Sequence, residues 1–366
     1  MLQQERDIQF DTGQAFYRAN SQRSRDLGVL AAIVYRQQVG QLRVLDGMTG
    51  CGIRVLRYGV EAAADYLWAN DGDPEVHFTL RQNLTRYLQS DRFHMTHEPI
   101  ANVLWQCALE RDYYDLIDID AFGNPANFLP FCLNALRYGG LLYLTSTDGR
   151  AVSGHFPQDS LRLYGTYARS HPSVQEQALR ILIGAIAQQA AFQNCSIQPI
   201  FSLYYGQVYR VMVRLLPQVP DLVKTYGFLG YCPACGHYQS IPWRYLSRAT
   251  CPYHHPPEPL SLTGPLWLGA LHDRPFIVAM LAEAEPRHWS DIIPLLNLFS
   301  AEAELPPYLF PLGEIGRRGK LDIPKRDRLI QALQAEGFEA TATHIDSQAI
   351  KTNATLADCI AIAKAL

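Results

Sequence analysis

The sequence predicts an α/β protein in which a doubly wound, mostly parallel sheet is followed by a smaller α+β domain. Three observations support this fold class. Strand and helix signals alternate through the first two hundred residues. A glycine-rich loop at residues 46–52 joins the first expected strand to the helix after it. The chain has 366 residues, 48 % of them hydrophobic, so two domains of ordinary size can each bury a core.

Seven strands are expected in the first domain, at residues 41–45, 66–69, 95–97, 113–120, 141–145, 197–204 and 208–215. Helical spacing is expected at 52–64, 74–88, 100–109, 128–137 and 174–192, and residues 149–172 are expected to form a long polar loop. The last two strands are joined by a turn at 205–207 and would add an antiparallel edge strand. This arrangement is the seven-stranded methyltransferase variant of the Rossmann-like fold, not a symmetric dinucleotide fold.

The alternation stops at Pro217-Gln-Val-Pro220, which we interpret as a domain boundary. The first domain then comprises residues 1–216 and the second residues 217–366. The second part is less regular, contains many prolines, and ends in an expected helix near 356–366.

The glycine-rich loop reads Asp46-Gly-Met-Thr-Gly-Cys-Gly52, and its glycines, Gly50 among them, would let the backbone approach a ligand closely. Asp71 ends the next strand, where an acidic side chain can bind a ribose diol. The Gly-x-Gly-x-x-Gly spacing that binds a pyrophosphate is absent, which favours S-adenosylmethionine over NAD. A plain structural turn is the alternative. Asn102 follows the third strand, where it would either reach an adenine or simply begin a helix.

The fourth strand ends in Asp118-Ile-Asp-Ala-Phe-Gly-Asn-Pro125. Asp120 could accept hydrogen bonds from an exocyclic amine, and Phe122 could stack on the base that carries it. The segment therefore indicates amino-group chemistry on a nucleobase, with Asp120 and Phe122 as catalytic candidates. Core packing is the alternative for Phe122, and we expect Asp118 to be a structural carboxylate.

Four residues in the second domain have the spacing of a tetrahedral zinc site with two knuckles, namely Cys232, Cys235, Cys251 and His254. His255 is an alternative fourth ligand and His237 a weaker one. The other reading of residues 232–255 is three unpaired thiols in a proline-rich loop. We expect the remaining five cysteines to be buried thiols, which fits a reducing, cytoplasmic protein.

The net charge of −3 argues against a uniformly basic surface, so a nucleic acid would have to bind local basic clusters. One cluster contains Arg317, Arg318 and Lys320 and is expected to be a loop leading into a helix; the alternative is a solvated face without a partner. Lys351 is a second candidate contact. No apolar run approaches the ~20 residues that cross a bilayer, and no secretory signal or protein partner is evident.

Several segments resemble the tRNA (guanine-26-N2) dimethyltransferase family over nearly the whole chain. The matching blocks are 15–17 and 24–27, the cofactor loop 46–57, 69–71, the strand end 118–125, 139–148, 180–187, 264–273, 343–344 and 350–354. The resemblance implies methyl transfer from S-adenosylmethionine to the N2 amine of guanine, at position 26 of tRNA, with mono- and dimethylation. Some members of the family carry a zinc site in the second domain.

The resemblance also implies roles for individual residues. Arg25, Asp46 and Asp71 would contact S-adenosylmethionine, Asp120 would be the catalytic carboxylate, and Phe16 and Phe122 would flank the target base. The chain departs from the family pattern at Ala121, where a proline is usual, and at Ile100, where an aspartate is usual. Two other functions are therefore kept: methylation of another RNA position or base, and a zinc-stabilised RNA-binding protein without activity.

Overall fold

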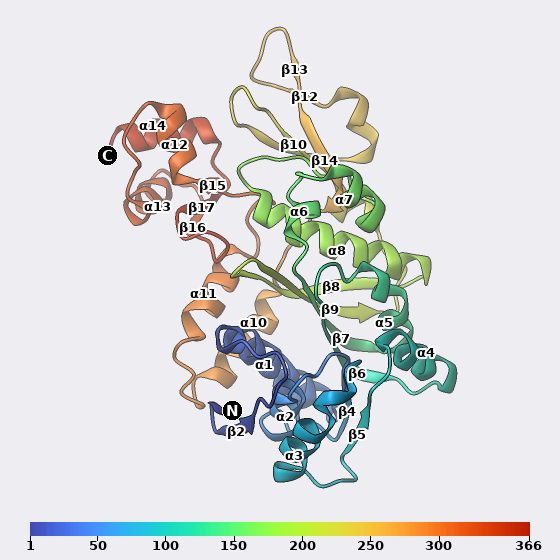
Figure 1. Ribbon diagram of the computed structural model, residues 1–366. Helices are drawn as coiled ribbons and strands as arrows, with labels where there is room; N and C mark the ends of the chain where they lie inside the picture. The colour runs from blue at the N-terminus through green and yellow to red at the C-terminus, as the bar shows by residue number, and fades with distance from the viewer.

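The computed structural model describes all residues, 1–366, and is built around one seven-stranded sheet (Figure 1). The strand order is β5-β4-β3-β6-β7-β9-β8. In this order across the sheet, the strands are Phe93–Thr96, Tyr66–Asn70, Arg43–Asp46, Tyr114–Asp120, Leu136–Ser146, Val208–Leu216 and Ser196–Tyr205. The doubly wound fold predicted from the sequence is confirmed.

The antiparallel strand does not lie where the sequence predicted. β9 is antiparallel to both of its neighbours, β7 and β8, and lies between them. The edge strand is therefore β8, which is parallel to the rest of the sheet. The chain reaches the edge after the long helix α8 (Val174–Phe192) and then returns through a hairpin to pair with β7.

Helices cover both faces of this sheet. Successive strand residues point to opposite sides, and apolar residues on both sides need to be buried. On one face Leu116 and Tyr143 join a core that includes residues of α1, α2 and α3 (Gln22–Val39, Ile53–Val60, His77–Tyr87). On the other face Ile117 and Leu144 join residues of α8 and of α4 and α5 (Ile100–Glu110, Leu129–Ala135).

In the first domain, three helices and one hairpin were not expected. The chain begins with the hairpin of β1 and β2 (Leu2–Glu5, Ile8–Asp11), followed by the buried helix α1. The segment predicted to be a long polar loop contains two short helices, α6 and α7 (Gly149–Val152, Pro157–Tyr164). Asp148 caps the first of them by accepting a hydrogen bond from the Ala151 amide.

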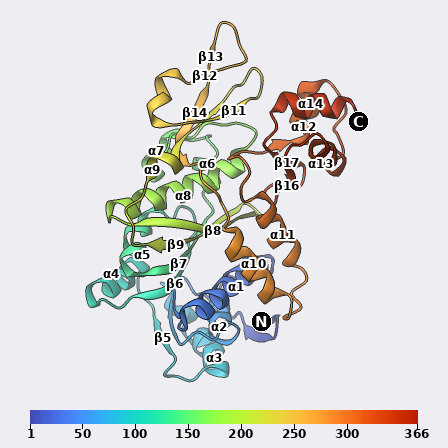
Figure 2. The ribbon, with the colours of Figure 1, turned by 180° about the vertical axis from the view of Figure 1, so that it is seen from behind.

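The region after residue 217 begins with the short helix α9 (Leu222–Thr225) and a small sheet of β10, β11 and β14 (Tyr226–Tyr231, Tyr238–Ile241, Ser261–Trp267). The strand pair β12 and β13 (Thr250–Cys251, Glu258–Pro259) projects beyond it (Figure 1). Helices α10 and α11 (Arg274–Ala284, Ile293–Glu302) then return to the large sheet, where α10 lies beside α1 in both views (Figure 2).

The chain ends in a compact group of short elements (Figure 2), which contacts the loop at Pro233 and Ala234 through Arg318. Its three-stranded sheet contains β15, β17 and β16 (Phe310–Pro311, Ala349–Thr352, Ala340–Ala342), and its helices are α12, α13 and α14 (Leu312–Gly319, Arg326–Ala335, Leu356–Lys364). None of the helices in the protein has the length and apolarity that a membrane span requires.

Candidate active site and candidate zinc centre

A pocket of about 530 Å³ opens at the carboxyl ends of β4, β6 and β7. Ligands of open α/β sheets bind at this edge, because the loops that follow parallel strands meet there. The pocket brings together six residues that were predicted from the sequence: Phe16, Arg25, Gly50, Asp71, Asp120 and Phe122. They come from the N-terminal segment and from three strand-to-helix connections, so the fold assembles them from distant parts of the chain.

The glycine-rich loop forms one wall of this pocket. Gly50 has a φ of +57°, a conformation that favours glycine, and its amide donates a 2.6 Å hydrogen bond to the carboxylate of Asp71. A Cβ at Gly47 would lie 2.6 Å from Ile100 Cδ1, so a side chain there would disrupt the packing under the loop. The loop is therefore held in one shape, with its backbone close to Asp71.

Asp120 is held between two arginines. Arg210 from β9 donates a 2.8 Å hydrogen bond to Oδ1, and Arg54 from α2 donates to Oδ2. The carboxylate side chain keeps 29 % of its surface exposed toward the pocket. Burial favours the neutral acid, but the charges of Arg210 and Arg54 outweigh it and hold the pKa of Asp120 below its usual value. Asp120 is therefore a fixed anion and a weak base.

Asp46 and Asp118 lie next to Arg54, on the side away from the pocket, and are fully buried. Asp118 accepts a 2.8 Å hydrogen bond from the hydroxyl of Tyr58, which fits the structural role expected of it. Asp46 lies 3.3 Å from Arg54 and does not line the pocket, so its predicted contact with the cofactor stays a prediction. Burial raises the pKa of both carboxyls, and the charge of Arg54 opposes that effect.

Phe16 and Phe122 are the two exposed rings of the pocket, with 62 % and 77 % of their surfaces accessible. Their centroids are 5.4 Å apart with an interplanar angle of 69°, an edge-to-face contact. Core packing of Phe122, the alternative considered from the sequence, is therefore wrong. The guanidinium of Arg18 lies 5.3 Å above the ring of Phe16.

Two residues predicted to bind the cofactor, Arg25 and Asn102, do not point freely into the pocket. Arg25 lines the pocket, but its side chain is buried against Glu5 of the N-terminal hairpin and also donates to the carbonyl of Arg18. Asn102 is exposed on α4 and does not line the pocket. Of the two readings of Asn102, the structure favours the first turn of a helix.

Cys232, Cys235, Cys251 and His254 come together in the second domain, with all four possible ligand atoms within 4.8 Å of one another. Cys232 Sγ lies 3.4 Å from His254 Nε2, and Cys235 Sγ lies 3.5 Å from Cys251 Sγ. Separations of this size suit four ligands at about 2.0–2.3 Å from one tetrahedral zinc ion. His254, rather than His255, is the histidine in this cluster.

A second cluster of this kind contains His272, Glu302 and His344 and joins the large domain to the C-terminal elements. His344 Nδ1 bonds Glu302, and His272 Nε2 lies 3.3 Å from the same oxygen. His272 Nδ1 and His344 Nε2 are buried without partners. Histidines that bind a metal almost always donate their other ring nitrogen to an acceptor. We therefore interpret the cluster as a buried polar contact rather than a metal centre.

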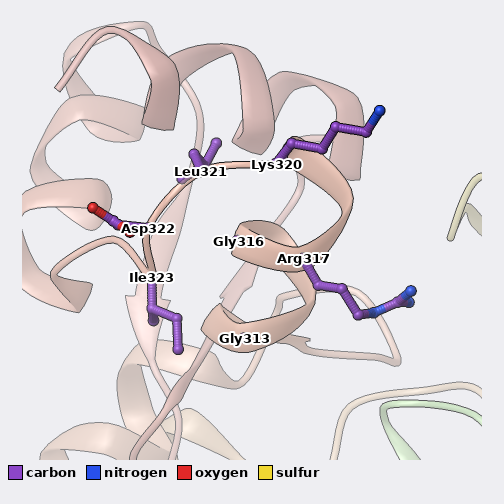
Figure 3. Close-up of a pocket in the computed structure, with 7 residues that line it drawn as sticks. All are labelled: Gly313, Gly316, Arg317, Lys320, Leu321, Asp322 and Ile323. Carbon is purple, nitrogen blue, oxygen red and sulfur yellow. The ribbon is translucent and has the colours of Figure 1, made fainter.

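The predicted tRNA contacts differ in exposure. Arg317 and Lys320 are exposed at the end of α12, and Figure 3 shows both side chains extending away from Asp322 and Ile323. Lys351, the second candidate for tRNA contact, is only 1 % exposed, so its side chain is not at the surface where a phosphate could reach it. Its ammonium group donates a 2.6 Å hydrogen bond to the buried Glu176 of α8, 175 residues away in the sequence.

Arg318 is also not free to bind RNA, because its guanidinium is bonded to the loop between Cys232 and Cys235. The basic segment was expected to be a loop before a helix. Instead Arg317 and Arg318 lie in the last turn of α12, and the short loop after it leads into α13.

Sequence reasoning did not identify Arg54 and Arg210, the partners of Asp120. A signal for Arg210 is present, since it interrupts the apolar run Val208-Tyr-Arg-Val-Met-Val213 of a strand buried on both faces. A charged residue in such a strand needs a buried partner of opposite charge. That partner is Asp120 at the end of β6, two strands away in the sheet.

Comparison with known proteins gives one consistent result. A family model described as N2,N2-dimethylguanosine tRNA methyltransferase matches residues 2–364. The tRNA (guanine(26)-N(2))-dimethyltransferase of Thermococcus kodakarensis is 30 % identical over 93 % of this chain and 90 % of its own length. The protein of that name from Methanothermobacter thermautotrophicus is 28 % identical over 94 % and 90 %. Trm1 from Pyrococcus horikoshii, solved with S-adenosyl-L-methionine, superposes with a TM-score of 0.85 at 25 % identity, covering 99 % of both chains.

Proposed function

Because the chain belongs to the N2,N2-dimethylguanosine tRNA methyltransferase family, we propose that it methylates the N2 amine of guanine 26 in tRNA. The methyl donor is S-adenosylmethionine, the molecule bound by the Pyrococcus horikoshii relative. One observation supports the chemistry above all others: a permanently charged Asp120 stands beside two exposed aromatic rings in a single pocket. That combination suits a planar base with an exocyclic amine.

The donor fits the part of the pocket between Gly50 and Asp71. The Gly50 backbone leaves room for close approach, and the Asp71 carboxylate lines the same part of the pocket, where it can accept hydrogen bonds from a ribose diol. Arg25 and Asp46 remain the other two candidates from the family resemblance. Arg25 is buried against Glu5 and bonds the Arg18 carbonyl, so in this proposal it holds the N-terminal segment that borders the donor. When bound, S-adenosylmethionine supplies a sulfonium methyl group, whose S–C bond breaks as the bond from carbon to guanine N2 forms.

Asp120 accepts a hydrogen bond from the guanine amine. This bond orients the lone pair of guanine N2 toward the methyl group. Because the two arginines keep its pKa low, Asp120 is poorly suited to remove the proton before transfer. Its charge instead stabilises the positive charge that develops on N2. The methylated nitrogen is strongly acidic while it carries that charge, so its proton leaves to water after transfer. The same sequence repeats for the second methyl.

Phe16 and Phe122 hold the base by its faces. Stacking of a base on an aromatic ring contributes ~1–3 kcal/mol. The rings touch edge to face, so Phe16, on the segment after β2, has to move away from Phe122 before a base can enter between them. The target base leaves the tRNA stack to reach the pocket, at a cost of a few kcal/mol.

Cys232, Cys235, Cys251 and His254 hold a structural zinc ion in this proposal. Three thiols and one imidazole are the donor set that zinc prefers, and no fifth group or open position points to catalysis. Arg317 and Lys320 contact tRNA phosphates from the C-terminal elements, since they are the exposed members of the basic cluster. Residues 1–216 carry the methyl transfer and residues 217–366 carry tRNA binding.

Calorimetric titration with S-adenosylmethionine tests the enzyme reading against an RNA-binding protein without activity. The wild type should bind the donor, and Asp71→Asn should bind it about tenfold more weakly, because a charged hydrogen bond to the ribose is worth about 1.5 kcal/mol. Lack of binding by the wild type at millimolar concentration would support the non-enzymatic reading. Metal analysis of the same preparation should find one zinc per chain.

A further inference from the structure

Arg318 joins α12 to the first pair of cysteines. Its guanidinium donates hydrogen bonds of 2.8 Å to the carbonyl of Pro233, 2.6 Å to the carbonyl of Ala234 and 3.0 Å to the hydroxyl of Tyr231. It also bonds the carboxylate of Glu314 on its own helix, and only 13 % of the side chain is exposed. Pro233 and Ala234 are the two residues between Cys232 and Cys235.

The loop that Arg318 binds also packs tightly against the C-terminal elements. Gly236 follows the cysteine pair with a φ of +80°. A Cβ there would lie 2.4 Å from Leu356 of α14 and 3.0 Å from Arg318 Nε. The position of the loop therefore decides where α12 and α14 lie, and metal ligands at both ends of the loop decide its shape.

An adjoining side of α12 carries the proposed tRNA contacts. Successive residues of a helix point about 100° apart, so Arg318 faces the cysteine loop while Arg317 faces solvent with 66 % of its side chain exposed. Lys320 follows at the end of the helix, and the glycines Gly313 and Gly316 leave a shallow hollow beside it (Figure 3). A rotation of α12 about its axis would move this basic face.

We propose that Arg318 is a positioning residue that couples the metal-bound state of the cysteine cluster to the tRNA-binding face of α12. When zinc is bound, the loop offers two fixed carbonyls to Arg318, and the helix presents Arg317 and Lys320 to the phosphates. When zinc is lost, the loop loses its shape and α12 loses its anchor. The inference rests on the proposed zinc site and the proposed tRNA substrate, and it identifies the contact through which the first supports the second.

A double-mutant cycle tests this coupling without a chelator, which would also remove Mg²⁺ from the tRNA. The dissociation constant for tRNA is measured by fluorescence anisotropy for wild type, Cys235→Ser, Arg318→Gln and the double variant. Each single change should weaken binding about tenfold, equivalent to about 1.4 kcal/mol. The double variant should be only about twofold weaker than either single variant, because both changes remove the same anchor.

Lys320→Gln reports on the exposed face itself, since Lys320 lies on the same helix end and has no contact with the cysteine loop. It should weaken binding in the wild type and have a smaller effect in the Cys235→Ser background, because the displaced helix no longer presents Lys320 to the phosphates. Binding of S-adenosylmethionine should not change in any variant, which excludes general unfolding. Arg318→Lys is a second probe: an ammonium cannot span two carbonyls and a hydroxyl as a guanidinium does, so it should restore little of the affinity.

Additive losses for Cys235→Ser and Arg318→Gln would overturn the coupling while leaving zinc and tRNA binding intact. The same conclusion follows if Arg318→Gln binds tRNA as the wild type does. Absence of zinc from the wild type, or absence of tRNA binding by it, contradicts the proposed function itself and would be seen before any variant is made.

Discussion

Replacing Asp120 by asparagine should abolish most methyl transfer while leaving the shape of the pocket unchanged. The carboxylate has two oxygens; Arg210 and Arg54 each bond one of them, and the remaining lone pairs can accept from the guanine amine. Asparagine keeps one acceptor oxygen, but its NH2 group replaces the other. That NH2 group then faces another donor, either an arginine or the guanine amine. A hydrogen bond to a charged group is worth about 1.5–3 kcal/mol, and two such interactions are weakened. Together they contribute about 3–6 kcal/mol, so at 1.36 kcal/mol for each factor of ten the rate should fall about 10²–10⁴-fold.

The assay is single-turnover methyl transfer with tRNA and S-adenosylmethionine both saturating. The loss should appear in this rate, while the dissociation constant for tRNA changes less than about threefold, because the phosphates are bound elsewhere. Asp73→Asn is the matched control: Asp73 also lines the pocket, but its carboxylate only caps the next helical turn. A rate for Asp120→Asn within fivefold of wild type would refute the role of Asp120.

The same arrangement predicts a pH dependence. The folded pKa of Asp120 is held below its usual value, so the anion is present above that pKa and is lost only as the pH falls through it. Wild-type turnover should therefore show no loss from Asp120 between pH 7 and about pH 5. Arg210→Gln removes one of the two charges, so the acidic limb of its rate profile should move to higher pH. An unchanged limb in this variant would contradict the electrostatic argument.

Three further changes have defined outcomes. Phe122→Leu should weaken tRNA-dependent transfer by about tenfold, since stacking contributes ~1–3 kcal/mol, with S-adenosylmethionine affinity unchanged in calorimetry. Phe16→Leu should do the same, and normal kinetics in both would exclude a stacked base. Burial lowers the pKa of His272 to about 4, so the unfolded chain binds up to one more proton than the folded chain between about pH 6.5 and 4, and stability is lost as the pH falls through that window. Denaturant titrations at pH 7 and pH 4 measure this loss in the free energy of unfolding. In His272→Gln the loss should be smaller by about 3 kcal/mol, and a loss equal to that of the wild type would show that His272 does not titrate in this range.

The sheet and half of the active site could be predicted because their signals are local. Asp71, Asp120 and Phe122 each stand where an apolar run ends, and the ends of parallel strands meet at one edge. The antiparallel strand was misplaced because the order of β8 and β9 depends on which of them reaches β7, which no local pattern records. The helix α1 was missed because it is buried all round and lacks an amphipathic pattern.

The errors in the basic residues have one physical cause. Lys351 and Arg318 look like surface charges in the sequence, since each follows or precedes polar residues. Their partners, Glu176 and the Pro233 and Ala234 carbonyls, lie 175, 85 and 84 residues away. Only the folded chain shows that Lys351 is paired with a buried carboxylate, that Arg318 is bonded to the cysteine loop, and that Arg317 and Lys320 remain exposed. Arg54 and Arg210 were overlooked for the same reason.

The most direct test of the account is methyl transfer from labelled S-adenosylmethionine to an unmodified tRNA transcript with guanine at position 26, beside the same transcript with adenine there. We expect label in the guanine transcript alone, recovered as N2-methyl- and N2,N2-dimethylguanosine on nucleoside analysis. Label in both transcripts would keep the enzyme and move its target to another position. Label in neither, with zinc and donor supplied, would contradict the central claim and favour an RNA-binding protein without activity.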